Sequence, residues 1–307
     1  MALLRFAVSI PQTFLHGGVE PAAIRKFLAR AEALGCYEGV WDQEQIIGAM
    51  PTLDPVDLLT YAAACTEKLR LGCAVLITAI RSPVHLAKSL STIDQLSRGR
   101  LDVGVGLGAG TRTYPAFGVD PPGRVARFTE GIRLMKALWT EPRVTFEGRF
   151  WRLQDAAMEP KPFQKPHPPL WFGGNHPNAL RRAVQLGDGF MGAGSSSNAD
   201  FADNMRHLKT FLGEAKRDPQ EFDFGKRIYI AVDEDKDRAW PRLAEWFQAR
   251  YGRANYEHVA IWGSAAECAD RVREVTDAGA RLVLFTPVFD EYEQMERIAS
   301  EVIPKLG

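Results

Sequence analysis

The sequence has no excess of either charge. Lysine plus arginine and aspartate plus glutamate each number 38 among its 307 residues, so the formal net charge is zero. A strongly basic chain would be attracted to nucleic acid or to an anionic membrane surface, and this chain has no such overall field. We therefore expect neither nucleic acid nor a membrane among its partners.

The sequence also has little cysteine and no metal-binding motif. Its four cysteines, Cys36, Cys65, Cys73 and Cys268, are scattered in apolar surroundings without a C-x-x-C pair, and its six histidines form no H-E-x-x-H pattern. Those spacings are the usual signs of a disulfide framework or of a zinc site. We expect reduced cysteines in the core and no bound metal.

A long hydrophobic run is missing as well. The N-terminal stretch "MALLRFAVSIPQ" is interrupted by Arg5, which leaves the apolar run too short for a membrane span or a secretory signal. We expect a cytoplasmic enzyme.

What the sequence does contain is a regular alternation of strand-like and helix-like segments. This alternation is typical of βα units around a parallel sheet. Strands are expected at 4–10, 38–41, 69–77, 101–108, 170–172, 189–191, 227–232 and 281–287. Their number predicts an α/β fold, a (β/α)8 TIM barrel formed by one domain over residues 1–307. A doubly wound open sheet is the alternative fold, because alternation alone does not show closure.

Two segments depart from the alternation. A hairpin turning at Glu147-Gly148, followed by a proline-rich stretch, is expected over about 142–168, and an irregular segment over about 235–262.

Elsewhere, capping residues define the helix starts. Asp54 precedes Pro55, and Ser264 forms a capping box with Glu267.

The stretch "RLDVGVGLGAGTR" has glycine at every second position from 104 to 110. The letters fit a dinucleotide-binding G-x-G-x-x-A pattern, but no helix pattern begins at Ala109 as that motif requires. At strand period, Gly104, Gly106 and Gly108 share one face, which predicts close approach of something bulky to the backbone. A bound cofactor is one interpretation. A helix packed tightly over the strand is the other.

Polar and glycine residues follow other strands at the edge where barrel enzymes place their active sites. In "GGNHP", residues 173–177, Gly173-Gly174 permits close backbone approach and Pro177 begins a helix, which predicts a phosphate site. A simple turn capped by Asn175 or His176 is the alternative. Asp42 could accept a hydrogen bond at its strand end, or lie exposed in a loop. Of the adjacent Arg181 and Arg182, one is expected to face solvent.

Several segments together resemble the bacterial luciferase-like monooxygenase superfamily, and more closely its branch of deazaflavin (coenzyme F420)-dependent oxidoreductases. The resemblance covers nearly the whole chain. It is carried, in order along the sequence, by "LSTIDQLSRGRLDVGVGLGAG", "AFGVDPPGRVARFTEGIRLMKALWTE", "VTFEGRFWRL", "PPLWFGGNHPNALRRAVQLGDGF" and "WGSAAECADRVREVTDAGARLVLF".

The resemblance implies hydride transfer between coenzyme F420 and an organic substrate, with the cofactor across the C-terminal mouth of the barrel. It implies a non-prolyl cis peptide at Ala74-Val75, a homodimer, and a flavin or F420 reductase as a possible partner. Asp42 and Gln43 are the candidate catalytic residues. The candidate cofactor-binding residues are Asp42, Ala74, Val75, Gly106, Leu107, Gly108, Gly173, Gly174, Asn175 and His176.

One position departs from the F420-dependent branch. That branch often has Asp-His after the second strand, whereas this chain has Asp42-Gln43. The Gln43 amide can orient a substrate or ring oxygen, but it cannot act as a general acid near neutral pH. Two alternative functions are an FMN-dependent, oxygen-using monooxygenase of the same superfamily and a flavin-binding protein without turnover.

Overall fold

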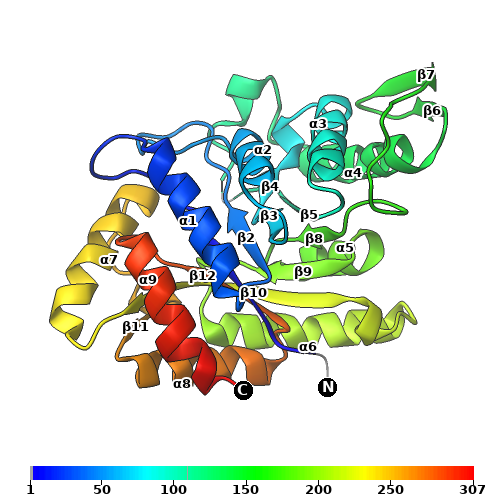
Figure 1. Cartoon of the computed structure of the whole chain (residues 1–307). Coiled ribbons are helices and arrows are strands. Elements are labelled where there is room, and N and C mark those ends of the chain that lie inside the picture. Colours follow the sequence, from blue (N-terminus) through cyan, green and yellow to red (C-terminus); the bar gives the residue numbers. More distant parts are fainter. Residues whose placement is uncertain (1–2, 109) are drawn as a thin grey trace.

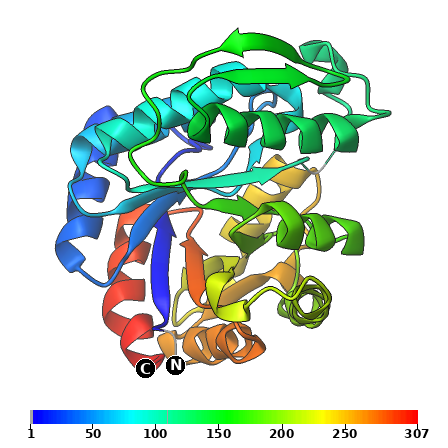
Figure 2. The ribbon, with the colours of Figure 1, turned by 90° about the vertical axis from the view of Figure 1, so that its right-hand side faces the viewer.

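The computed structural model describes residues 3–108 and 110–307, and its centre is a closed parallel barrel (Figures 1 and 2). Parallel pairing of the first strand with the last closes the ring, which confirms the expected TIM barrel and excludes the open sheet. The barrel strands, in their order around the ring, are β1 (Arg5–Ser9), β2 (Gly39–Asp42), β3 (Arg70–Cys73), β5 (Leu101–Gly106), β8 (Leu170–Phe172), β9 (Gly189–Gly192), β10 (Asp223–Val232) and β12 (Leu282–Thr286).

Two short strands extend this ring. β4 (Leu76–Ile77) follows a break after β3 and pairs with the end of β5. β11 (Ala260–Gly263) pairs with the C-terminal half of β10.

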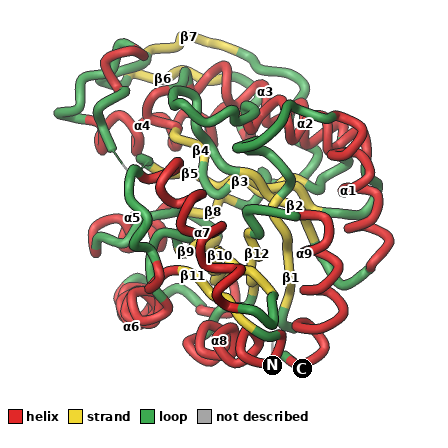
Figure 3. The backbone as a smooth tube through the Cα atoms, turned by 90° about the vertical axis from the view of Figure 1, so that its left-hand side faces the viewer, coloured by secondary structure: helices red, strands yellow, loops and turns green. Residues whose placement is uncertain are grey.

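The helices surround the barrel (Figure 3). They are α1 (Pro21–Leu34), α2 (Pro55–Cys65), α3 (Pro83–Leu96), α4 (Arg124–Thr140), α5 (Pro177–Leu186), α6 (Asn198–Glu214), α7 (Lys236–Tyr251), α8 (Ala265–Ala278) and α9 (Glu291–Arg297). The expected capping residues are confirmed. The Asp54 carboxylate accepts from the Val56 N–H at 2.9 Å, and Ser264 and Glu267 cap each other. No helix in the described ranges has the length and apolar character needed to cross a membrane.

Side chains of the strands alternate between two buried regions. Outward-facing residues such as Val103 and Val105 of β5 pack against the helices in the large core. Inward-facing residues fill the barrel, where the rings of Trp41 and Trp171 meet edge to face with their centroids 5.7 Å apart. The lower barrel is therefore packed, and a ligand has room only toward its mouth.

The expected hairpin is present as β6 (Val144–Glu147) and β7 (Arg152–Ala156). Its turn is tied to α4 by the Glu130 carboxylate, which accepts from the backbone N–H groups of Arg149, Phe150 and Trp151 at 3.0, 2.8 and 3.0 Å.

The expectation of an irregular segment over 235–262 was wrong, because α7 and β11 lie there. Asp235 caps α7 and accepts from two backbone N–H groups of its first turn. Leu243, Trp246 and Phe247 are buried at helical spacing against Tyr229 of β10. Pro241 lies in the second turn, and it hid the helical pattern because proline usually ends a helix.

Candidate active site

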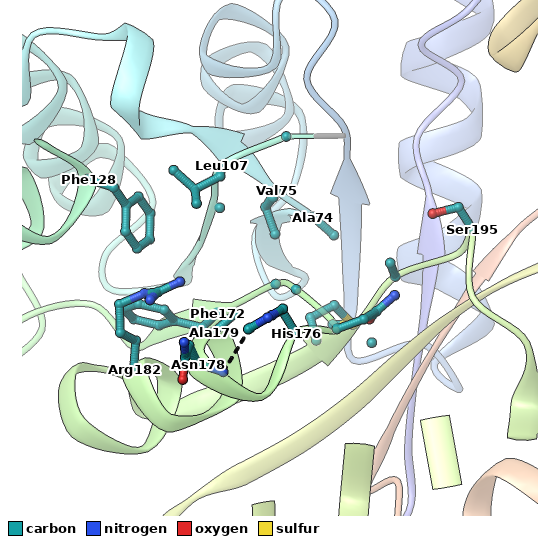
Figure 4. A pocket seen from close by; sticks show the side chains of 18 of the residues that line it. Ala74, Val75, Leu107, Phe128, Phe172, His176, Asn178, Ala179, Arg182 and Ser195 are labelled. Carbon is teal, nitrogen blue, oxygen red and sulfur yellow. Dashed lines mark hydrogen bonds between the residues drawn. The ribbon is translucent and has the colours of Figure 1, made fainter. Parts of the chain in front are cut away.

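A pocket of about 640 Å³ opens at the C-terminal ends of the strands (Figure 4). All the expected cofactor-binding residues except Asp42 line it, which brings together side chains and backbone from three separate βα loops. These residues are Ala74, Val75, Gly106, Leu107, Gly108, Gly173, Gly174, Asn175 and His176.

The break between β3 and β4 forms one wall of the pocket. The peptide bond between Ala74 and Val75 is cis, as the resemblance implied. The Ala74 N–H donates to the Asp42 carbonyl at 2.9 Å, so the break remains attached to β2. Figure 4 shows both side chains at the pocket surface.

The glycine face of β5, formed by Gly104 and Gly106, packs against the end of β3 and the break that follows it, and not against a cofactor. A Cβ added at Gly104 would lie 1.8 Å from the Cys73 carbonyl oxygen, and one added at Gly106 would lie 2.5 Å from Cγ2 of Val75. The expectation that these glycines leave room for a ring system was therefore wrong, and so was the alternative of an overlying helix. The close approach comes from the end of β3 at Gly104 and from the break that follows β3 at Gly106.

Gly108 differs from these two glycines because it lies beyond the end of β5. Its φ of +73° is left-handed, a conformation that glycine adopts without steric cost. The preceding Leu107 carbonyl accepts a hydrogen bond from the Tyr114 hydroxyl at 2.6 Å, so the chain turns here instead of continuing as a strand.

The loop 173–177 is both a capped turn and part of the pocket wall. His176 is the cap, and its Nδ1 accepts from the Asn178 N–H at 3.1 Å. Gly174 has a φ of +139°. Within the described part of the chain, the backbone N–H groups of Gly174, Asn175 and His176 form no hydrogen bond. They remain available to an anionic group in the pocket.

Arginine side chains give the pocket a positive lining. Arg182, on α5, lies in its wall beside Phe172 (Figure 4). Arg181 faces away, where its Nη1 contacts Glu214 at 2.5 Å and its guanidinium lies over the ring of Phe211. The expectation that one of the two faces solvent is therefore confirmed.

Asp42 is fully buried at the end of β2 and does not line the large pocket. Neither carboxylate oxygen has a hydrogen-bond partner by distance and angle. Burial raises the pKa of Asp42 well above its usual range, and the nearby charges of Asp54 and Glu44 act in the same direction, while the Cys73 thiol opposes them. The alternative of an exposed loop aspartate was wrong.

Gln43 lines a second, small recess on the other side of the barrel mouth, formed by the ends of β1, β2 and β12 and by α7 and α9. Its backbone N–H and carbonyl are both held by the Gln12 side chain, at 2.9 and 2.6 Å. Its side-chain amide donates to Ser9 Oγ at 3.4 Å, and Ser9 Oγ lies 2.8 Å from the Thr286 hydroxyl. Of the two candidate catalytic residues, Gln43 therefore lines the recess, and Asp42 is buried beside it at the end of β2.

Sequence reasoning missed several pocket residues, namely Arg124, Phe128, Met191, Ser195 and Arg227. The available signal for Arg227 was the pair of charged residues, Lys226 and Arg227, inside the otherwise largely apolar strand β10. The described residues contain no cluster of three or more histidine, cysteine or acidic side chains suited to a metal.

The comparisons with known proteins agree with this geometry. The luciferase-like monooxygenase family model matches residues 1–282. The chain is 26% identical over 278 residues to the F420-dependent glucose-6-phosphate dehydrogenase of Intrasporangium calvum, covering 81% of this chain and 83% of the relative. It is 37% identical over 222 residues to the FMNH(2)-dependent dimethylsulfone monooxygenase of Pseudomonas putida, covering 71% of this chain and 56% of the relative.

Among solved structures, an F420-dependent secondary alcohol dehydrogenase in complex with an F420-acetone adduct has the same fold. The TM-score is 0.87 at 21% identity, and the match covers 99% of both chains.

Proposed function

Since the chain belongs to the luciferase-like monooxygenase family, we propose that this enzyme transfers hydride between coenzyme F420 and an organic substrate. The observation that carries the proposal is the large pocket, which has unpaired backbone N–H groups at Gly174, Asn175 and His176 and a wall formed by Ala74 and Val75. Relatives named for F420 dependence support the deazaflavin as the cofactor.

The residues present fit a phosphate-bearing flavin or deazaflavin. The loop 174–176 and Arg182 would hold the phosphate, because free N–H groups and a guanidinium both favour an anion. Leu107, Val75 and Ala74 would support the ring system, with the backbone of Gly106, Gly108 and Gly173 completing the wall. When bound, the deazaflavin supplies the hydride chemistry, and the protein positions the reactants and excludes water.

Asp42 and Gln43, which are adjacent at the end of β2, are proposed to act on the substrate. Burial keeps the Asp42 carboxyl protonated to a higher pH than usual, so that it can donate a hydrogen bond or a proton to a group arriving from the pocket. The Gln43 amide, held by Gln12 and Ser9, would orient a substrate oxygen.

Titration of the purified protein with coenzyme F420 and, separately, with FMN tests the proposal. F420 should bind with micromolar or tighter affinity and more tightly than FMN, as measured by deazaflavin and flavin fluorescence. Equal or tighter binding of FMN would favour the oxygen-using monooxygenase, which the Pseudomonas putida relative supports. Binding without reductase-coupled turnover across a substrate panel would favour a flavin-binding protein.

We also propose a homodimer, with a flavin or F420 reductase as a second partner. Ile46 and Ile47, on the loop before α2, are 42% and 51% exposed and offer an apolar contact. Sedimentation velocity of the wild type and of an Ile47→Asp variant tests the dimer. The cytoplasmic location stays a prediction.

A further inference from the structure

Arg227 is a buried arginine among the residues that line the large pocket. It lies on the inward face of β10, is only 7% exposed, and lines the pocket beside Met191 and Gly192. Its Nε is buried and has no hydrogen-bond partner among the residues that the structure describes. Buried polar groups are nearly always paired, so this donor calls for a ligand.

The charge of Arg227 is not neutralised by the protein. The groups that act on it are the phenols of Tyr229 and Tyr251 and the Cys73 thiol, and none of the ion pairs found in residues 3–108 and 110–307 includes it. A guanidinium does not lose its proton in a protein. An unpaired buried charge carries a large desolvation cost, which an anion bound in the pocket would offset.

Neighbouring groups fix the orientation of this guanidinium. Its Nη2 donates to Tyr229 Oη at 2.9 Å, and that oxygen lies 2.7 Å from Tyr251 Oη. A Cβ at Gly194 would lie 2.6 Å from Nε, so only glycine allows this loop to pack here. Lys226 fastens the same loop, since its Nζ donates to the carbonyl and hydroxyl oxygens of Ser196 at 2.7 and 3.0 Å.

We propose that Arg227 binds a carboxylate of the substrate. Figure 4 places Ser195, the neighbour of Gly194, across the pocket from Arg182, and Arg227 packs against the Gly194 side of the pocket. Arg227 supplies a single guanidinium charge on β10, which matches a monoanion, because the amine of Lys226 is directed at the loop and the other arginines of the pocket, Arg124 and Arg182, lie on α4 and α5. This inference rests on the proposed function in assigning the Arg182 end to the cofactor.

The test uses sodium propionate as the probe and neutral propionamide as its uncharged match. Isothermal titration calorimetry is run on F420-free and F420-saturated protein at constant ionic strength. Wild type should bind propionate and not propionamide. Arg227→Met should weaken propionate binding by more than about tenfold, because a charge-assisted pair is lost. Arg227→Lys keeps the charge without the planar fork and should be intermediate.

Three further variants and readouts separate binding from structure. Arg181→Gln removes an arginine outside the pocket and should leave propionate affinity unchanged. Tyr229→Phe keeps Arg227 but removes its orienting oxygen, and should weaken propionate binding with unchanged F420 affinity. The melting temperature of ligand-free Arg227→Met should not fall, because an uncompensated buried charge has been replaced by an apolar group of similar size.

Three results would overturn the inference. The first is that wild type shows no detectable propionate binding. The second is that wild type and the Arg227 variants bind propionate equally. The third is that Arg227→Met and Arg227→Lys lose F420 affinity, which would place Arg227 in the cofactor site. Arg227-dependent propionate binding by a protein that does not bind F420 would instead support the anion site and refute the proposed cofactor.

Discussion

Gly106 of β5 and Val75 of the β3–β4 break fit against each other so closely that a single methyl group would separate them. A Cβ at Gly106 would lie 2.5 Å from Val75 Cγ2, whereas it would lie 3.6 Å from Val75 Cβ. The conflict is therefore with the branched end of the valine. Shortening that side chain would remove it.

Gly106→Ala should destabilise the ligand-free protein by about 1–3 kcal/mol, because the added methyl overpacks a stiff β-branched neighbour. The free energy of unfolding in urea measures the effect. In a Val75→Ala background the same substitution should cost markedly less, and the double-mutant cycle should give a coupling of about 1 kcal/mol or more.

Gly213→Ala is the matched control for this cycle. Gly213 lies in α6, and a Cβ there would meet no atom within 4 Å, so alanine should raise stability by about 0.5–1 kcal/mol through helix propensity. If Gly106→Ala lowers the free energy of unfolding equally in both backgrounds, Val75 is not the neighbour that excludes a side chain at position 106.

Arg182→Gln should lower F420 affinity by about tenfold or more, because a charge-assisted hydrogen bond to the phosphate is lost. Arg181→Gln should have little effect, since Arg181 contacts Glu214 on the outer side of α5. Fluorescence titration of both variants at low and high salt measures the difference. The residual affinity of Arg182→Gln should depend less on salt than that of wild type. A larger loss in Arg181→Gln than in Arg182→Gln would contradict this assignment.

Asp42→Asn should change the pH dependence of stability in a defined direction. Because burial raises the pKa of Asp42 in the folded state, the folded protein holds this proton at pH values where the unfolded chain has released it. Stability from this group is complete below the unfolded pKa of about 3.9 and is lost as the pH rises toward the folded pKa.

Asparagine does not titrate, so the variant should gain stability relative to wild type as the pH increases through that window. Urea unfolding of both proteins from pH 4 to pH 8 measures the difference. Taking the difference between the two proteins cancels titrating groups that do not interact with Asp42, Lys226 among them. A constant difference across this range would show that the pKa of Asp42 is not raised.

Lys226→Met should loosen the loop over Arg227. The ammonium bridges the Ala193 carbonyl and both oxygens of Ser196, and methionine keeps the bulk of the side chain without its donors. Hydrogen exchange of the peptide containing residues 193–196 should become faster, with exchange in α1 unchanged as the internal control. Unchanged exchange in both segments would mean that this loop is held by other contacts.

Features specified by adjacent residues could be predicted from the sequence. The caps at Asp54 and Ser264 are local, because each side chain reaches backbone groups two or three positions away. Strand and helix alternation is local in the same sense, and it predicted the barrel while leaving the open sheet as an alternative, which the pairing of β1 with β12 excludes. The resemblance then gave the cis peptide at Ala74-Val75 and the pocket residues that surround it.

Features that depend on distant contacts could not be predicted. The reason for a glycine at position 106 is Val75, a residue of the break between β3 and β4, and strand periodicity shows only that one face of β5 lacks side chains. Arg227 was singled out because no acidic side chain in the described structure pairs with it. A sequence pattern does not show which side chains lie close together in space. The helix α7 was not predicted because Pro241 interrupts its helical pattern of apolar residues, and because its stability comes from burial against β10.

The contact of Ser9 with Thr286 joins residues 277 positions apart and lies at the seam where β1 meets β12. During synthesis, β1 is made first, but its pairing partner β12 is made only when the chain is almost complete. The recess around Gln43 draws residues from both sides of this seam, so the ribosome must release nearly the full sequence before that half of the mouth exists. A truncated chain ending before β12 would expose an unpaired edge of β1 and should be a substrate for chaperones and proteases rather than a partly active enzyme.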